Sequence, residues 1–210
     1  GVDDSSDQKG KLLRTSCGPI EAGRLVLATG PDPVAVKRFG GFDLPQRSTP
    51  GVIVVTRPVK PLLRGILVAP GIHIHQRMDG RLVIGEQEGA PDTAAHAARL
   101  ADRPTRFPDD SLADQHAQRL LAMTRDYLPR LGAVEIDEVL IGWRPLPVDG
   151  HPVIGPSPAD DRVYVAIMHS GVSLAAITGD LVARELADGV EMALLQPFRG
   201  DRVFDTKNRY

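Results

Sequence analysis

The chain has 210 residues, enough for one domain or for one domain and part of another. Apolar residues make up 42% and charged residues 25%, which is typical of a folded soluble protein and excludes a disordered, collagen-like or coiled-coil chain. The formal net charge is −2 and only 4% of residues are aromatic, so the composition gives no support to a basic nucleic-acid groove lined by stacking rings.

Location is constrained by what the sequence lacks. No apolar run approaches the roughly 18 residues of a membrane helix, and the polar start GVDDSSDQKG is not typical of a signal or transit peptide. Cys17 is the single cysteine, which excludes internal disulfides and cysteine-based metal clusters. We therefore expect a reducing compartment, the cytoplasm.

The first predicted elements are a hairpin and a buried strand. Residues 10–20 form the hairpin, with Gly18-Pro19 as its turn. Residues 25–29 are continuously apolar, which is typical of a strand covered on both faces in a partly parallel sheet. Residues 40–50 resemble a loop.

The next predicted elements are strands at residues 52–56 and 65–68 and a second hairpin, HIHQRMDGRLVIGEQ. Its turn is Asp79-Gly80, a dipeptide that tolerates positive φ. The period of two along the first arm separates two faces. One carries His73, His75 and Arg77, and the other carries Ile72, Ile74 and Gln76. One face is thus apolar, and the other is suited to line a cavity.

A long amphipathic helix follows a segment without a clear pattern, residues 90–108. The helix begins near Ser111, with Asp110 or Ser111 as its cap, and ends at Pro129.

The last third is the most regular part of the sequence. Residues 134–143 and 163–168 are predicted strands, and residues 169–173 are a tight connection. The final helix covers residues 174–188, with Gly189 as its C-terminal cap.

The connection into this helix is one candidate site. Gly171 lets a ligand approach the backbone, and the N–H groups of the first helical turn suit a carbonyl oxygen or a developing anion. The alternative is an ordinary strand–helix connection capped by Ser173.

Arg144 is a second candidate, at a strand end before a proline that fixes the chain. Its guanidinium could hold a carboxylate through two parallel hydrogen bonds. Alternatively, it stacks on Trp143 or pairs with Asp149 to brace the loop.

Two other chemistries have little support. His73 and His75 could both ligate a metal, but no third ligand stands at a recognised spacing. Ser170 and Ser173, near His169, lack the G-x-S-x-G context of a nucleophile elbow, so a hydrolase is rejected.

Two segments carry a family resemblance, GWRPLPVDGHPVIGP and VYVAIMHSGVSLAAITGDLVARELADG, followed by a tail with Pro197-Phe198-Arg199 and residues 201–204. Together they resemble the C-terminal half of the FAD-dependent D-amino acid oxidase-like oxidoreductases, which include glycine and sarcosine oxidases. Upstream, GPIEAGRLVLATGPDPVAV resembles a later strand of the family's flavin domain, and HIHQRMDGRLVIGE resembles a hairpin of its substrate domain. The resemblance covers most of residues 10–204.

The resemblance implies roles for individual residues. Arg144 stands where the family places the arginine that binds the substrate carboxylate, and His73 and His75 stand on the sheet that roofs the substrate pocket. The implied flavin contacts are His169, Ser170, Gly171, Val172, Ser173 and Leu174 together with Ala28, Thr29 and Gly30. No residue is assigned as catalytic and none as a metal ligand.

The implied reaction is oxidation of an amine or amino acid. A hydride leaves the carbon next to the amine for flavin N5, and water hydrolyses the resulting imine. Since Cys17 lies far from the position where the family attaches flavin, we expect non-covalent FAD.

The sequence also departs from the family, because it has no G-x-G-x-x-G after an apolar strand and no acidic ribose-binding residue behind it. The chain begins with glycine, which we interpret as processing or truncation. We expect FAD binding to require a missing N-terminal segment or a partner chain, and the strand at residues 25–29 to expose an apolar edge.

The expected fold is α/β, with a partial Rossmann-like FAD domain and an antiparallel substrate domain. Residues 1–45 and 141–210 would form the FAD-binding part, and residues 46–140 the substrate-binding part. The first functional hypothesis is the C-terminal portion of an FAD-dependent oxidoreductase acting on a small-molecule amine or amino acid. The second is a non-catalytic ligand-binding or interaction module that has lost the nucleotide site.

Overall fold

The computed structural model describes residues 2–3, 11–47, 49–86 and 98–205. The chain divides into two compact units, which are described separately. The middle unit comprises residues 49–143, and the terminal unit comprises residues 1–48 and 144–210.

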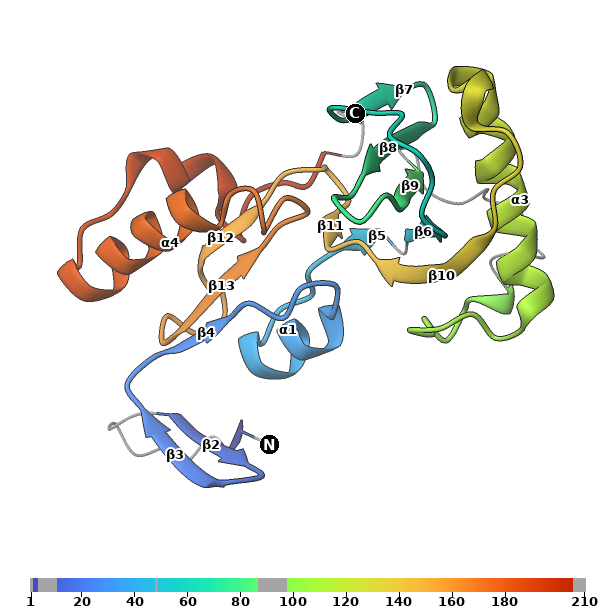
Figure 1. Cartoon of the computed structure of the whole chain (residues 1–210). Helices are drawn as coiled ribbons and strands as arrows, with labels where there is room; N and C mark the ends of the chain where they lie inside the picture. The colour runs from blue at the N-terminus through green and yellow to red at the C-terminus, as the bar shows by residue number, and fades with distance from the viewer. Residues whose placement is uncertain (1, 4–10, 48, 87–97, 206–210) are drawn as a thin grey trace. The chain divides into compact units, whose positions relative to one another are not determined.

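The middle unit is an antiparallel sheet packed against one long helix (Figure 1). The strand order is β10-β6-β9-β8-β7. The strands are β6 (Pro50–Thr56), β7 (Leu67–Ala69), β8 (Ile72–Gln76), β9 (Leu82–Glu86) and β10 (Ile136–Trp143), and the helix is α3 (Asp110–Tyr127), followed by a 3-10 turn at Pro129–Leu131. The predicted hairpin is confirmed, with Gly80 at φ 89° in its turn. Strand β10 extends past residue 140, where a domain boundary was expected.

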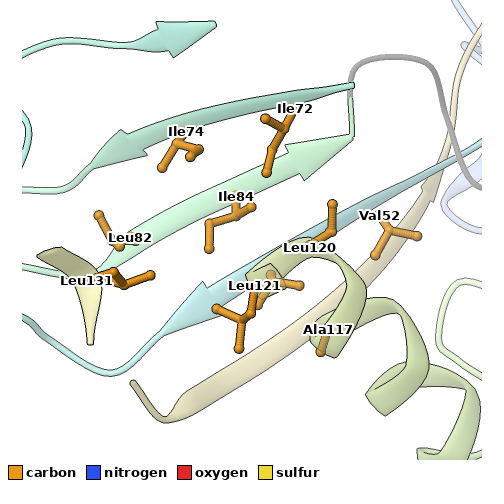
Figure 2. Close-up of a cluster of buried hydrophobic side chains, with 10 residues drawn as sticks. Val52, Ile72, Ile74, Leu82, Ile84, Ala117, Leu120, Leu121 and Leu131 are labelled. Atoms are coloured by element: carbon orange, nitrogen blue, oxygen red, sulfur yellow. The ribbon is translucent and has the colours of Figure 1, made fainter. Parts of the chain in front are cut away.

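The core of the middle unit lies between α3 and the sheet face turned toward it (Figure 2). Alternate residues of the strands supply one side of this core, and α3 supplies the other. Figure 2 shows Ile72, Ile74, Leu82 and Ile84 of the hairpin with Ala117, Leu120 and Leu121 of α3, all of them buried. The predicted division of β8 into two faces is therefore confirmed.

The predicted cap of α3 is wrong by one or two residues. Asp109, in extended conformation, accepts a hydrogen bond from the Leu112 amide at 2.8 Å, so the helix begins at Asp110. Asp109, Asp110 and Ser111 are all good cap residues, and the sequence alone does not choose among them.

Within its described residues, the terminal unit contains three small sheets and two α-helices. The N-terminal sheet has the order β1-β2-β3, a central sheet has the order β12-β13-β4, and β5 pairs with β11. The elements are β1 (Val2–Asp3), β2 (Lys11–Thr15), β3 (Gly18–Ala22), β4 (Leu25–Leu27), α1 (Pro33–Gly40), β5 (Gln46–Arg47), β11 (Leu146–Pro147), β12 (Val153–Pro156), β13 (Val163–Ile167), α4 (Ala175–Ala183), a π-helical turn (Arg184–Asp188) and a 3-10 helix (Ala193–Phe198).

Several local predictions for this unit are confirmed and two are corrected. Strands β4 and β13 are parallel as expected, and Gly189, at φ 66°, caps the π-helical turn that follows α4. The N-terminal hairpin exists, but its turn is Ser16-Cys17, because Gly18 already pairs with Thr15 at the start of β3. The mixed α/β class predicted from the sequence is confirmed.

Candidate functional site

The site in the terminal unit begins at the carboxyl ends of two parallel strands. Leu25, Val26 and Leu27 of β4 stand beside residues 163–165 of β13. Because the strands run in the same direction, residues 28–30 and 168–169 leave the sheet at the same edge. Ligands of open α/β sheets bind at such an edge. Two segments predicted to contact a cofactor are thus brought together by the fold.

The connection after β13 presents its backbone to solvent. Residues 169–174 are all exposed, and Val172 keeps 95% of its surface accessible. Helix α4 begins after Leu174 with no side-chain cap, so the alternative of a Ser173 cap is wrong. The Leu174 amide donates to the Ser170 carbonyl at 2.9 Å and the Ala175 amide to the Val172 carbonyl at 3.4 Å. A ligand acceptor would therefore meet the remaining N–H groups of the first turn, with the positive end of the helix dipole behind them.

The segment after β4 is held by its neighbours. Gly30 adopts φ 60°, and its carbonyl accepts a hydrogen bond from Gln46 Nε2 at 3.4 Å. Two residues later the Asp32 side chain caps α1, accepting from the Ala35 amide at 3.0 Å. Residues 28–30 thus lie in a turn between the end of β4 and the capped start of α1.

Arg144 and His169, two of the predicted site residues, interact electrostatically in this unit. Partial desolvation, and then the positive charge of Arg144, hold the pKa of His169 below its ordinary value of 6.5. His169 is therefore predominantly neutral at pH 7. A negative ligand placed beside both side chains would be attracted by Arg144 and would favour protonation of His169.

In the structure, the ion-pair partner of Asp149 is Arg202 and not Arg144, which was the alternative expected from the sequence. Its carboxylate accepts two hydrogen bonds from Arg202, at 2.8 and 3.1 Å. Sequence reasoning missed Arg202, because 53 residues separate the partners and no local spacing connects them.

His73 and His75 belong to the middle unit, on the face of β8 turned away from α3. The His73 ring lies so close to Gly85 that a Cβ there would stand 2.3 Å from Nε2, so only glycine leaves room for the ring. His75 lines a surface hollow of about 610 Å³ together with Arg64, Arg77 and Met78. Contact of either histidine with substrate stays a prediction. Within the described residues, no cluster of three or more metal-ligating side chains occurs.

A family model described as FAD dependent oxidoreductase matches residues 1–185 of the chain. The chain belongs to this family. A glycine oxidase from Geobacillus kaustophilus is 28% identical over 197 residues, which are 92% of this chain and 48% of that protein. A glycine oxidase from Pseudomonas aeruginosa is 26% identical over 181 residues, which are 85% of this chain and 45% of that protein.

Solved structures agree with the family. The crystal structure of glycine oxidase from Geobacillus kaustophilus matches with a TM-score of 0.76 and 27% identity, covering 97% of this chain and 51% of that one. The structure of L-proline dehydrogenase from P. horikoshii shares the fold, with a TM-score of 0.71 at 19% identity. The chain thus spans about half the length of these enzymes.

The residues present fit one side of a bound flavin. The exposed connection and uncapped start of α4 offer N–H donors and a positive dipole, as the electron-rich edge of a flavin requires. They do not include a pyrophosphate cradle, since G-x-G-x-x-G occurs nowhere in the sequence. Among the described residues, no helix has the length and apolarity needed to cross a bilayer.

Proposed function

We propose that this chain is the substrate-binding and flavin-capping portion of an FAD-dependent oxidoreductase that oxidises an amine or amino acid. The nucleotide end of FAD would be held by another segment or a partner chain carrying the G-x-G-x-x-G motif. The observation that carries the proposal is the joint placement of residues 28–30 and the uncapped start of α4 at one sheet edge, with Arg144 acting on His169 beside them.

The open edge of β4 supports the need for a further segment. Among the residues that the structure describes, β4 is an edge strand of its sheet, so its outer N–H and C=O groups could pair with another strand. Val26 on β4 is 44% exposed and Ile177 on α4 is 50% exposed. A covering element with an apolar face would bury both, and a strand of the nucleotide-binding part has that character.

Each chain residue has a distinct task in the proposed reaction. Arg144 binds the substrate carboxylate and so orients the carbon that loses hydride. Residues 169–173 offer backbone groups to the flavin edge. FAD, bound non-covalently, supplies the electron sink. The imine product would be hydrolysed by water. The exposed free Cys17 is in keeping with a reducing compartment such as the cytoplasm.

Flavin binding is the first test. The chain is mixed with, or expressed beside, a polypeptide that carries a G-x-G-x-x-G half of a glycine oxidase relative, and flavin absorbance is followed through gel filtration. We expect a yellow complex from the mixture and colourless protein from the chain alone. A colourless mixture, with the chain still monomeric and folded, would instead support the non-catalytic module.

Arg144→Met tests the substrate role in the reconstituted complex. Loss of a charge-assisted bidentate contact should raise KM for a carboxylate-bearing amine by the equivalent of about 2–3 kcal/mol. A substrate amine without a carboxylate is the matched control, and its KM should stay unchanged. If the wild-type chain and Arg144→Met have the same KM for the carboxylate substrate, Arg144 does not bind the substrate carboxylate.

A further inference from the structure

Two arginines near the C-terminus, Arg199 and Arg202, reach different parts of the terminal unit. They stand three residues apart, and the Arg202 guanidinium donates a hydrogen bond back to the Arg199 carbonyl at 3.1 Å. This bond ties the Arg202 side chain to the Arg199 backbone and leaves the Arg199 side chain to its own partners. Both are largely buried, and each forms a bidentate pair with a buried carboxylate.

Arg202 holds the loop that begins at Arg144. Its Nε and Nη2 donate to the two Asp149 oxygens at 2.8 and 3.1 Å, and Nη2 also donates to the His151 carbonyl at 3.2 Å. Burial by itself would raise the pKa of Asp149, but the Arg202 hydrogen bonds and the His151 amide outweigh it and hold this pKa below its ordinary value. Asp149 is thus a stable anion inside the loop.

The same loop is tied on its other side by β5. Arg47 Nη2 donates to the Val148 carbonyl at 2.6 Å, and the Val148 amide donates to Pro45 at 2.9 Å. With Arg202 on one side and β5 on the other, the backbone from Leu146 to His151 is fixed. The Leu146 amide donates to the Arg144 carbonyl at 2.9 Å, which ties the Arg144 backbone to this loop.

Arg199 holds the far end of the helix that starts at the flavin-facing connection. It donates to both Glu185 oxygens, at 2.9 and 2.5 Å, and to the Ile154 carbonyl on β12 at 3.2 Å. Glu185 also accepts from the Tyr164 hydroxyl on β13 at 2.5 Å. A Cβ at Gly155 would stand 2.7 Å from Arg199 Cδ, so glycine there makes room for the arginine.

We propose that Arg199 and Arg202 form a double clasp that positions the two halves of the site separately. Arg202 fixes the loop of the carboxylate-binding Arg144, and Arg199 fixes helix α4, whose start faces the flavin. This assignment of roles rests on the proposed function, whereas the clasp itself rests on the contacts above. Both arginines are positioning residues, since they act through Asp149 and Glu185.

Hydrogen–deuterium exchange of the 210-residue chain tests the clasp without any ligand. Arg202→Met should speed exchange of the amides in residues 146–151 about tenfold and leave residues 175–188 unchanged, because only one local anchor is lost. Arg199→Met should do the reverse. Asp149→Asn and Glu185→Gln should each reproduce the pattern of their partner arginine. Arg184→Met is the control, because its ion pair with Asp180 is exposed on both sides.

The lysine variants, R199K and R202K, keep the charge but lose the bidentate geometry, and should give smaller changes confined to the same segments. If a methionine variant does not fold, the lysine variant at the same position replaces it in the exchange measurement. Exchange that rises equally in both segments for either arginine, or in neither, overturns the separate clasps.

A second measurement uses the flavin-bound complex. R202M should raise KM for the carboxylate substrate with the flavin absorbance unchanged, and R199M should weaken flavin binding and shift its absorbance. The reverse assignment, or KM and absorbance moving together in both variants, overturns the division of roles. If the wild-type complex does not bind flavin, the proposed function is wrong. The hydrogen–deuterium exchange pattern would still test whether Arg199 and Arg202 hold separate segments.

Discussion

The two units differ in how their apolar side chains are covered. In the middle unit, the apolar face of the sheet is closed by α3 of the same chain, and residues such as Ile74, Ile84 and Leu120 have no exposed surface. In the terminal unit, apolar side chains on β4, on α4 and at Val172 remain exposed. Leu181 and Val182 are the buried residues of α4, and most of its other residues are exposed.

Buried and exposed apolar residues therefore have different expected effects on the stability of the chain and on its association with another segment. Apolar residues facing α3 in the middle unit contribute to the folding of the chain itself. Exposed apolar residues of the terminal unit contribute little to folding, and under the proposed function they form the surface that the nucleotide-binding half would cover.

The largest expected effect is in the core of the middle unit. Ile84→Ala should lower the free energy of unfolding by about 2–5 kcal/mol, since it removes fully buried methyl groups and leaves a cavity. Val68→Ala is the matched control, because that side chain is 63% exposed on the same sheet, and its effect should stay within about 0.5 kcal/mol. Urea denaturation followed by circular dichroism measures both, and equal losses would show that the sheet face is not closed as described.

A sharper comparison lies on one helix. Leu181 is 7% exposed and Ile177, one turn earlier on α4, is 50% exposed. Leu181→Ala should destabilise the chain by about 2 kcal/mol or more, while Ile177→Asp should leave the unfolding free energy within about 0.5 kcal/mol. In contrast, Ile177→Asp should abolish association with the nucleotide-binding half, as read by gel filtration. Loss of stability in the isolated chain from Ile177→Asp would mean that its face is already covered.

Patterns confined to a few neighbouring residues were predictable from the sequence. Asp79-Gly80 located the hairpin, and the alternation along β8 separated the buried isoleucines from the histidines. Helix α1 was missed, although Asp32 as cap, Pro33 in the first turn and Gly41 in the left-handed region are local signals that mark it. The helix has only eight residues between those signals, too few for a clear apolar period.

Contacts between distant segments were less predictable. The shared edge of β4 and β13 could be expected from two apolar strands in a parallel sheet. The choice of Arg202 over Arg144 as the partner of Asp149 could not, because sequence proximity favoured Arg144. Tertiary packing decided between two cations of equal charge, and only the path of the C-terminal segment brings Arg202 to the loop.

The smallest expected effect concerns the charge on His169. Arg144→Met removes one of the two causes that lower this pKa, so the pKa should rise toward 6.5 and remain below it, because partial desolvation persists. A histidine with a lowered pKa in the folded state costs stability as the pH falls below its unfolded pKa, so the variant should also lose less stability in acid. NMR titration of the imidazole Hε1 signal, assigned with His169→Gln, measures the change. An unchanged titration would place Arg144 too far away to act on His169, and the two would no longer count as neighbours in one site.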